Sequence, residues 1–211
     1  MKKRITEGHV FRKLNVQGKV FVEYAPLEKA WVPIEGSGFL YIYCLWVSGK
    51  FKGQSYGKQL LEYVINDAKK KGKQGVCVIS SKKKKSYLAD KKFFLKYGFE
   101  VVDQIEDYEL LSLSFNHQKP SFCKSVKQMM IDSNHITIYY SPQCPFTLNC
   151  IHEIKEYIKD CNIQVDFIKI DTLEKAKNIP CIFNNWAVFK NGKYVSHILL
   201  NKKGFEKLLN D

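Results

Sequence analysis

The sequence predicts an α/β (α+β) chain, with a mixed sheet that has helices on both faces and a smaller domain after it. Phe39–Val47 is an apolar, aromatic and β-branched run with the length of a buried strand. From Tyr56, apolar residues recur at helical spacing, so a helix follows this strand after a short loop. A second series of strand and helix patterns begins at His135, which predicts the smaller domain.

The segment before Phe39–Val47 predicts a hairpin. Residues 10–16 and 19–26 have the pattern of short strands, and Gln17-Gly18 between them is a turn pair. Residues 30–34 have the pattern of a third strand. We expect these strands to form an antiparallel meander that leads into Phe39–Val47.

The segment after the helix predicts the rest of the first domain. Gly75–Ser81 is a short β-branched run, and the helical crossover before it favours a buried parallel strand. Residues 87–96 predict a second helix that Gly98 ends, and residues 99–103 and 108–115 predict two closing strands. We therefore place the first domain at residues 1–117.

Residues 118–134 lack sustained periodicity and contain Pro120, so we interpret them as a linker. The second domain is then expected at residues 135–211. Its pattern predicts, in chain order, a strand over 135–141, a helix, a strand over 164–170, a short helix over 172–178, a hairpin that turns at Asn191-Gly192, and a last helix from Lys203.

The loop between Phe39–Val47 and its helix predicts an anion site. Backbone N–H groups and the positive end of the helix dipole meet at a helix start, and glycines let a ligand approach the main chain. An ordinary strand-to-helix connection is the alternative that the glycines alone leave open. The residues of the loop and the first helical turn are Lys52, Gly53, Gln54, Ser55, Tyr56, Gly57 and Lys58.

This strand, loop and helix resemble motif A of the GNAT acetyltransferases, whose pyrophosphate loop has the form Arg/Gln-x-x-Gly-x-Gly/Ala. Lys52 stands for the usual Arg or Gln, and Ser55 stands for the middle Gly. A lysine still neutralises phosphate as a point charge, and a serine tolerates a helix-start conformation. The departures therefore predict weaker or shifted binding of the same anion.

A second signature follows in the family's order. The helix that ends in Tyr97-Gly98-Phe99-Glu100 resembles GNAT motif B, so that the two motifs together cover residues 39–115. The runs 46–49 (Trp-Val-Ser-Gly) and 88–91 (Leu-Ala-Asp-Lys) are similar to bacterial proteins that join a GNAT domain to a YoaP-type C-terminal domain. The two motifs in order are more specific than either motif alone.

The resemblance implies acetyl-CoA as cosubstrate and direct transfer of its acetyl group to the primary amine of a small-molecule acceptor. A backbone N–H near Val47 would polarise the thioester carbonyl as an oxyanion hole. The donor would be bound by the residues at the end of the strand and in the loop: Trp46, Val47, Lys52, Gly53, Gln54, Ser55, Tyr56, Gly57 and Lys58.

Proton transfer is less well defined by the resemblance. Many relatives carry a tyrosine four residues before the Gly of Gly-Phe, and Phe94 occupies that position here. A phenyl ring cannot donate a proton, so the acid role is absent or has moved to Tyr87, Tyr97 or Tyr56, for which aromatic packing is the alternative. Glu23 and Glu35 are candidate bases acting through water, with an ordinary surface position as the alternative.

The start of the chain also departs from the family. The resemblance implies a strand and one or two helices before the hairpin, whereas about nine residues precede Val10. An open sheet edge and uncovered apolar surface would result. Either the domain is a shortened version, or a second protomer covers this face in a homodimer.

Residues 135–211 resemble the thioredoxin fold. Cys144 stands at a helix start, where the helix dipole favours a reactive thiolate. Thr147 occupies the position of the second redox cysteine, and Cys181 could approach Cys144 if the Ile179-Pro180 bond is cis. A thioredoxin-like scaffold without redox activity is the alternative.

Composition narrows the classes of partner. The net charge is +13, but the sequence has no recognised nucleic-acid motif, and the lysine runs 69–73 and 82–85 have the character of solvated surfaces. The alternative for 82–85 is attraction of the CoA 3′-phosphate.

No apolar run reaches the ~20 residues of a membrane span, and the N-terminus lacks the apolar stretch of a signal peptide. We expect neither a nucleic-acid nor a membrane partner.

Seven scattered cysteines, an odd number without a framework pattern, favour a reducing, cytoplasmic location. The sequence has no Cys-x-x-Cys pair and no histidine cluster, so we expect no metal site. Three function classes remain: an acetyl-CoA-dependent N-acetyltransferase as the leading prediction, a thiol oxidoreductase or redox sensor built on Cys144, and a non-catalytic CoA-binding protein.

Overall fold

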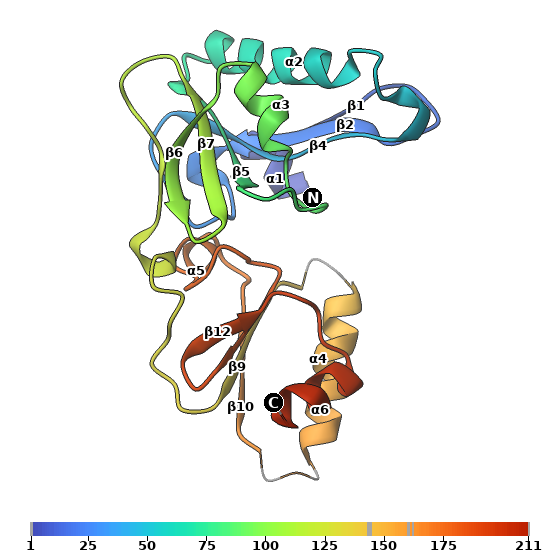
Figure 1. The fold of residues 1–211 in the computed structure, drawn as a ribbon, viewed down its shortest axis with the longest axis vertical. Coiled ribbons are helices and arrows are strands. Elements are labelled where there is room, and N and C mark those ends of the chain that lie inside the picture. Colours follow the sequence, from blue (N-terminus) through green and yellow to red (C-terminus); the bar gives the residue numbers. More distant parts are fainter. Residues whose placement is uncertain (1, 143–144, 160, 162, 211) are drawn as a thin grey trace. The chain divides into compact units, whose positions relative to one another are not determined.

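The computed structural model describes residues 2–142, 145–159, 161 and 163–210. The chain divides into two compact units, one of Met1–Ala30 with Ile34–Phe122 and one of Trp31–Pro33 with Cys123–Asp211. Both units combine strands and helices, which confirms the predicted α/β class (Figure 1).

A six-stranded mixed sheet forms the centre of the first unit, in the order β1-β2-β4-β5-β7-β6. β4 and β5 run parallel, and the other neighbouring strands run antiparallel. The strands, in spatial order, are β1 (Val10–Lys13), β2 (Val20–Pro26), β4 (Phe39–Val47), β5 (Gly75–Ser81), β7 (Tyr108–Ser114) and β6 (Glu100–Ile105).

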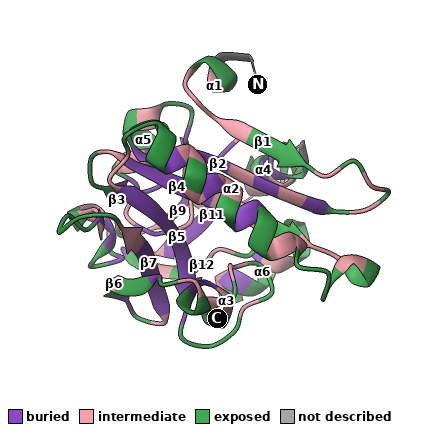
Figure 2. Ribbon diagram, turned by 90° about the horizontal axis from the view of Figure 1, so that it is seen from above, coloured by how far each residue is buried: buried purple, intermediate pink, exposed green. Residues whose placement is uncertain are grey.

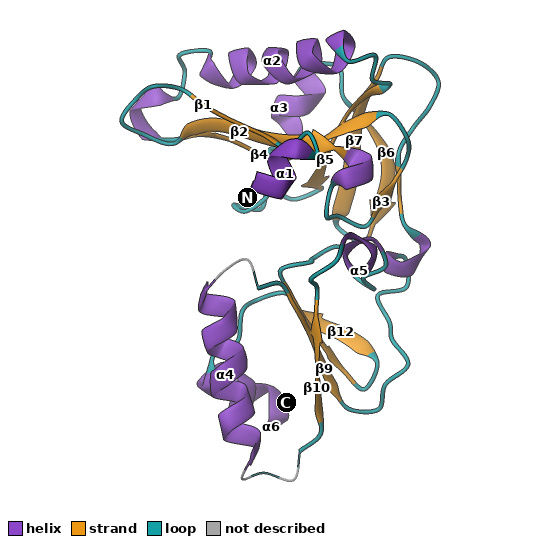
Figure 3. Cartoon of the chain, turned by 180° about the vertical axis from the view of Figure 1, so that it is seen from behind, coloured by secondary structure: helices purple, strands orange, loops and turns teal. Residues whose placement is uncertain are grey.

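The longer helices of this unit, α2 (Tyr56–Lys70) and α3 (Lys91–Lys96), cover one face of the sheet, and the short α1 (Lys2–Thr6) lies on the opposite side (Figures 1 and 3). Burial follows this arrangement, because the strands are mostly buried while the outer surfaces of the helices are exposed (Figure 2). The buried cluster under α2 and α3 contains Val20, Val22, Tyr24, Leu40, Ile42, Leu60, Leu61, Val64, Ala68, Val76, Val78, Phe94, Phe99 and Leu111.

The predicted meander is wrong in one place. β2 pairs directly with β4, and the segment 30–34 contributes only Ile34 to a two-residue strand, β3 (Ile34–Glu35). That strand pairs with β8 (Ser121–Phe122). Pro33 lies within the segment and lacks the N–H that a sheet ladder needs, so the extended run cannot continue as a central strand.

The second helix of this unit is shorter than the predicted 87–96. α3 begins at Lys91, because Asp90 is its N-cap and the Asp90 side chain accepts a 3.0 Å hydrogen bond from the Lys92 N–H. Residues 87–90 therefore belong to the loop before the helix. That loop forms part of the site described below.

The second unit has a four-stranded sheet in the order β10-β9-β11-β12, with β10 parallel to β9 and the other neighbours antiparallel. Ile151 and Ile154 of α4 and Phe205 and Leu208 of α6 are buried in one core cluster with the sheet. The elements are β9 (Ile136–Tyr140), α4 (Pro145–Lys159), β10 (Val165–Lys169), α5 (Leu173–Lys177), β11 (Trp186–Lys190), β12 (Lys193–Ser196) and α6 (Lys202–Asn210).

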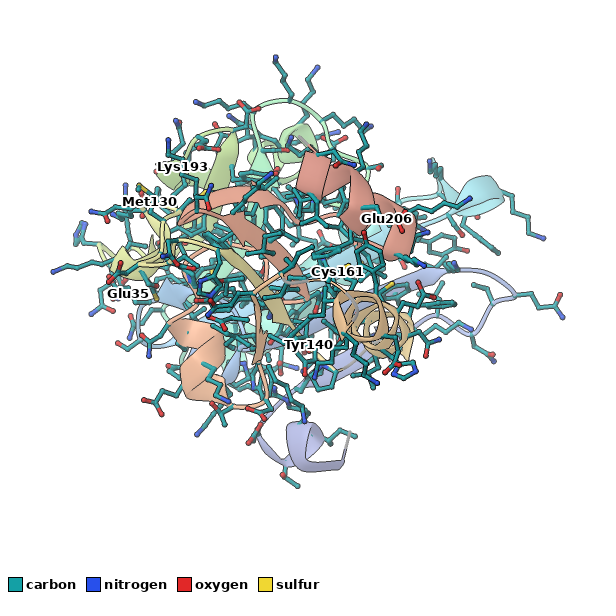
Figure 4. The ribbon with its side chains drawn as sticks, turned by 90° about the horizontal axis from the view of Figure 1, so that it is seen from below. Glu35, Met130, Tyr140, Cys161, Lys193 and Glu206 are labelled. Atoms are coloured by element: carbon teal, nitrogen blue, oxygen red, sulfur yellow. The ribbon has the colours of Figure 1, made fainter. Side chains whose placement is uncertain are left out.

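Part of the predicted linker is bound to this second sheet. Met130 forms an isolated antiparallel bridge with Lys193 at the start of β12 (Figure 4). The Tyr194 N–H donates a 3.2 Å hydrogen bond to the Met129 carbonyl. Residues 129–130 therefore cover the edge strand of the second sheet, which protects that edge from pairing with another chain.

Candidate active site

The sheet of the first unit opens between its two parallel strands. β4 pairs with β5 only where Phe39–Tyr41 lie against Gly75–Cys77. β4 then continues to Val47 in pairing with β2 alone, while β5 continues to Ser81 in pairing with β7 alone. Ligands bind at the carboxyl ends of parallel strands where neighbouring strands part, so this opening is the natural place for a site.

A β-bulge in β4 accompanies the opening. Glu23 of β2 lies opposite Cys44, and Tyr24 lies opposite Ile42, so Tyr43 is an extra residue in β4. A bulge bends its strand and increases the local twist, and bulges recur next to active sites. Beyond the bulge, Leu45 and Val47 pack against the cluster under α2.

The loop after β4 leads into the N-terminus of α2. Gly53 has φ +79° and Ser55, the N-cap residue, has φ 60° and ψ 7°, so both adopt left-handed conformations. The first helical N–H to find its acceptor belongs to Gln59, which donates 3.0 Å to the Ser55 carbonyl. The amides of Tyr56, Gly57 and Lys58 precede that bond and have no acceptor within the helix, as at every helix start. Ser55 makes no side-chain capping bond to them.

A cavity of about 720 Å³ adjoins this loop. Of the nine residues predicted to bind the donor, eight line it, and Gln54 does not. The Gln54 side chain instead donates a 2.7 Å hydrogen bond to the Lys50 carbonyl. The residues around the cavity are Leu45, Trp46, Val47, Phe51, Lys52, Gly53, Ser55, Tyr56, Gly57, Lys58, Lys84, Lys85, Ser86, Leu88, Ala89, Asp90, Phe93, Phe94 and Tyr97.

Residues 84–86 and 88–90 form the second wall of the cavity, and the sequence did not predict them as a group. These residues follow β5, whose carboxyl end lies beside that of β4. The rule that ligands bind at the ends of adjacent parallel strands would have pointed to them, because β5 was predicted to be parallel. In and beside this segment, the sequence indicated the lysine run 82–85 as an alternative attractor for a phosphate, Tyr87 as a candidate acid, and the run 88–91 as part of the resemblance.

The charge around the cavity is mainly positive. Lys52, Lys58, Lys84 and Lys85 line it, and Asp90 is the lining carboxylate. Partial burial acts to raise the pKa of Asp90, but hydrogen bonds from Lys84 and from the amides of α3 outweigh it and lower the pKa. The Lys84 Nζ lies 3.2 Å from the Asp90 carboxylate. The cavity therefore suits a ligand with several negative charges.

The predicted acid positions lie in different surroundings. Phe94 is buried, and its ring packs edge-on against Phe93 and Phe99. Tyr97 lines the cavity, with its ring 5.0 Å from that of Phe93. Tyr87 is 54% exposed and is not among the lining residues, and its hydroxyl lies 3.3 Å from that of Tyr108. The roles of both tyrosines stay predictions.

The two candidate carboxylate bases also differ in surroundings. The Glu23 Oε1 accepts a 2.8 Å hydrogen bond from the His9 Nε2, and both side chains are half-buried. Glu35 is exposed and accepts a 3.3 Å hydrogen bond from the Ser121 hydroxyl. Neither carboxylate lines the cavity itself.

In the second unit, Cys144 lies outside the described residues. Cys181 is fully buried, its thiol donates to the Phe183 carbonyl, and burial raises its pKa to about 12. The condition that placed Cys181 near Cys144 is not met, since the described chain contains no cis peptide bond. A thiol with so high a pKa is protonated at neutral pH and makes a poor nucleophile.

Two negative findings apply to the described residues. Within that part of the chain, no group of three or more His, Cys, Asp or Glu side chains is arranged to hold a metal ion. Among the same residues, no helix combines the length and apolar character needed to cross a membrane.

Two protein families match parts of the chain. Residues 16–101 match the family described as acetyltransferase (GNAT) domain, and residues 164–207 match the family described as YoaP-like. The uncharacterized N-acetyltransferase YoaP of Bacillus subtilis (strain 168) is 41% identical over 213 residues, which cover 100% of this chain and 85% of that protein.

Solved structures with a partial likeness to this chain include two acetyltransferases. One, from Elizabethkingia anophelis with acetyl-CoA bound, is 20% identical with a TM-score of 0.41, and covers 54% of this chain and 80% of that one. Another, the ribosomal-protein-S18-alanine N-acetyltransferase of Escherichia coli, is 16% identical with a TM-score of 0.39, and covers 54% and 73%. The full-length match to YoaP shows that the chain belongs to the GNAT N-acetyltransferases that carry a YoaP-like C-terminal region.

Proposed function

We propose that the protein transfers the acetyl group of acetyl-CoA to the primary amine of a small-molecule acceptor, by direct attack in a ternary complex. The observation that supports this most strongly is the opening between β4 and β5, with a basic cavity and the start of α2 at its mouth. The opening provides a strand edge for an extended ligand, and the helix start provides amides for an anion at the ligand's end.

The diphosphate of acetyl-CoA binds the loop in this proposal. The amides of Tyr56, Gly57 and Lys58 bind its oxygens, and the left-handed Gly53 and Ser55 shape the concave backbone around them. Lys52 and Lys58 supply positive charge, and both line the cavity. A lysine acts as a point charge here, so the site does not depend on the bidentate geometry that an arginine would impose.

The thioester lies beside the end of β4. The Val47 N–H donates to the carbonyl oxygen and stabilises the negative charge that develops there when the amine attacks. The C–N bond forms as the C–S bond breaks, and the leaving thiolate takes a proton. Tyr97 is the hydroxyl-bearing residue of α3's C-terminal end that lines the cavity, and we assign it this acid role in place of Phe94.

Donor binding can be tested by thermal denaturation with CoA. Millimolar CoA should raise the Tm of the full chain, because a ligand that binds only the folded state stabilises it. Lys52→Ala and Lys58→Ala should each weaken CoA binding about tenfold, since each removes a cation from the diphosphate. Lys70→Ala, at the exposed far end of α2, is the matched control. An unchanged Tm for a folded wild-type chain would refute the donor site.

The acid role can be tested separately. Tyr97→Phe keeps the ring and removes the hydroxyl, so it should lower kcat with little change in the affinity for CoA. Tyr87→Phe is the comparison, because Tyr87 lies away from the lining. CoA binding without turnover of any amine would instead favour the non-catalytic, CoA-binding alternative.

For the second unit, we propose a thioredoxin-like domain that is accessory to acetyl transfer. The strand order β10-β9-β11-β12, in which the first two strands are parallel, supports that topology. The redox alternative through Cys144 is tested by Cys144→Ser with Cys150→Ser as control, in an assay of disulfide reduction. No loss in Cys144→Ser would remove the redox function.

The domain limits 1–117 and 135–211, the linker 118–134, a homodimer and a cytoplasmic location also remain proposals. The seven scattered cysteines, an odd number without a framework pattern, are the feature that supports a reducing compartment. Sedimentation of the purified chain, with and without CoA, would test the homodimer.

A further inference from the structure

The sheet of the first unit has a second, partly exposed face beside the opening. Val20, Val22 and Tyr24 of β2 are buried under α2, so the alternate residues Phe21 and Glu23 point to the other face. In the β2–β4 register, Trp46 lies opposite Phe21 and Cys44 lies opposite Glu23. Residues opposite each other in a ladder share a face, so these side chains lie together.

Aromatic side chains gather on this face, and Phe11, Phe21 and Trp46 are called the aromatic shelf below. The rings of Phe11 and Phe21 stack with centroids 5.0 Å apart, and Trp46 lies opposite Phe21 in the register. Phe11 is 51% exposed and Trp46 is 43% exposed. Neighbouring exposed aromatics mark a binding surface more often than isolated ones do. Trp46 also lines the cavity, so the aromatic shelf borders the donor site.

A hydrogen-bonded pair of ionisable groups lies next to the aromatic shelf. The His9 Nε2 is 2.8 Å from the Glu23 Oε1, with side-chain exposures of 21% and 34%. The His9 ring also stacks on Tyr43, with centroids 5.4 Å apart. Tyr43 is the bulge residue, so the pair lies where β4 leaves β5 and the sheet opens.

We propose that this face binds the acceptor, that the acceptor is a primary amine with an aromatic or apolar body, and that the His9–Glu23 pair takes up its proton. The inference rests on the proposed function, because it needs a thioester in the cavity on the other side of β4. Glu23 attracts the ammonium group by charge, and the aromatic shelf buries the apolar body. Trp46 belongs to both the donor site and the acceptor site, because it lines the cavity and is part of the aromatic shelf.

The chemistry balances with the groups present. The acceptor arrives as an ammonium ion and gives one proton to the His9–Glu23 pair, which then carries it to water. The neutral amine attacks the thioester carbon, the C–N bond forms and the C–S bond breaks. Tyr97 protonates the leaving thiolate, and the second proton lost by the nitrogen returns to Tyr97, so the products are the acetamide and CoA.

Other ionisable groups surround the pair. Arg4 of α1 and Glu7 in the turn after α1 form their own ion pair at 3.3 Å, and the His9 backbone N–H donates to the Arg4 carbonyl. From β4 come Tyr43 and Cys44, and burial together with the nearby Glu23 raises the pKa of the Cys44 thiol. Cys44 therefore stays protonated through neutral pH.

The experiment uses the full chain with acetyl-CoA and two probe amines, phenethylamine and ethylamine. In Phe11→Ala, half-saturation of the enzyme should need about ten times more phenethylamine, because only the larger amine loses apolar contact. The concentrations of ethylamine and of acetyl-CoA that half-saturate the enzyme should stay unchanged. Phe115→Ala, another partly exposed aromatic of this unit, is the matched control.

Glu23→Gln and His9→Asn should lower kcat about a hundredfold for both amines and shift the acidic limb of the pH profile, with CoA affinity retained. Glu23→Asp should recover part of the rate, which a purely structural role would not predict. Glu35→Gln is the control for a distant carboxylate of the same unit.

The outcomes separate the two proposals. A wild-type chain that does not bind CoA would overturn the proposed function. A chain that binds CoA but acetylates neither probe, or acetylates ethylamine as well as phenethylamine, would overturn the aromatic acceptor class. Folded Glu23→Gln and His9→Asn variants with the wild-type kcat and pH profile would overturn the proton-accepting role.

Discussion

Gly57, in the first turn of α2, lies so close to Phe93 of α3 that a Cβ on the glycine would stand 3.3 Å from the phenyl Cε2. The same Cβ would lie 3.8 Å from the Val47 side chain. The glycine therefore permits the close approach of both elements at the mouth of the cavity.

Substitutions at Gly57 should show a strong dependence on size. Gly57→Ala should change stability little, because the tight Cβ contact opposes the gain in helix propensity. Gly57→Leu should cost roughly 2 kcal/mol of unfolding free energy and weaken CoA binding, because the side chain would force Phe93 aside. The double variant Gly57→Leu with Phe93→Ala should recover part of the stability in urea denaturation. Equal effects of Ala and Leu would contradict the contact.

Ser55 adopts a left-handed conformation that glycine accepts at no cost. Ser55→Gly should raise the free energy of unfolding by about 0.5 kcal/mol, because relief of strain exceeds the added chain entropy. Ser48→Gly is the control, since Ser48 has φ −100° and its hydroxyl accepts from the Lys19 N–H. That variant should lose stability. A loss at both positions would show that the Ser55 backbone is unstrained.

Lys91 and Glu109 form an ion pair that joins α3 to β7. The Lys91 Nζ lies 2.8 and 2.7 Å from the two carboxylate oxygens, and Glu109 is only 4% exposed. Lys91→Met should cost roughly 3 kcal/mol, because it leaves a buried carboxylate without its cation. The double variant Lys91→Met with Glu109→Leu should recover most of this in a denaturation cycle. Additive losses would mean that the two groups do not interact.

Tyr24 connects β2 to α2, since its hydroxyl donates a 2.8 Å hydrogen bond to the Asp67 carboxylate. Burial, and then this bond, raise the pKa of Tyr24 well above its usual value near 10. A raised pKa in the folded state means that its stabilisation is complete below pH ~10 and is lost as pH rises further.

The pH dependence gives a specific test of Tyr24. The wild-type chain should lose stability as the pH rises above ~10, and Tyr24→Phe should lose less over the same range. At neutral pH, Tyr24→Phe should cost about 1.5 kcal/mol, because the Asp67 carboxylate loses a donor. Tyr63→Phe is a nearby comparison, as its ring lies edge-on to Tyr24. Parallel alkaline losses in wild type and Tyr24→Phe would contradict the assignment.

The strand–loop–helix at the centre of the site could be predicted because its signals are local. Each signal comes from residues that are close in the chain: the apolar run Phe39–Val47, the glycines of the loop, and the apolar spacing from Tyr56. β4 and α2 lie at the predicted positions. Local signals also located the Asn191-Gly192 hairpin, where both residues have positive φ.

Other features depend on contacts between distant segments. Residues 84–86 and 88–90 line the cavity because β5 lies beside β4, which no local pattern of that loop reveals. The segment 30–34 is β-like by composition, yet within the described residues it pairs, through Ile34, with β8, far along the chain. α3 begins after Asp90 because Asp90 is its N-cap, whereas the pattern of residues 87–96 predicts an earlier start.

By itself, the sequence predicted the order of most strands and helices, a candidate anion site in the loop before α2, and the family, because these predictions follow from local residue types and their spacing. The tertiary structure decided where β4 and β5 separate, that Tyr97 and not Tyr87 lines the cavity, and that His9 meets Glu23. The physical reason is that strand pairing, bulges and side-chain contacts join residues far apart in the chain, and their energies arise only when the sheet forms.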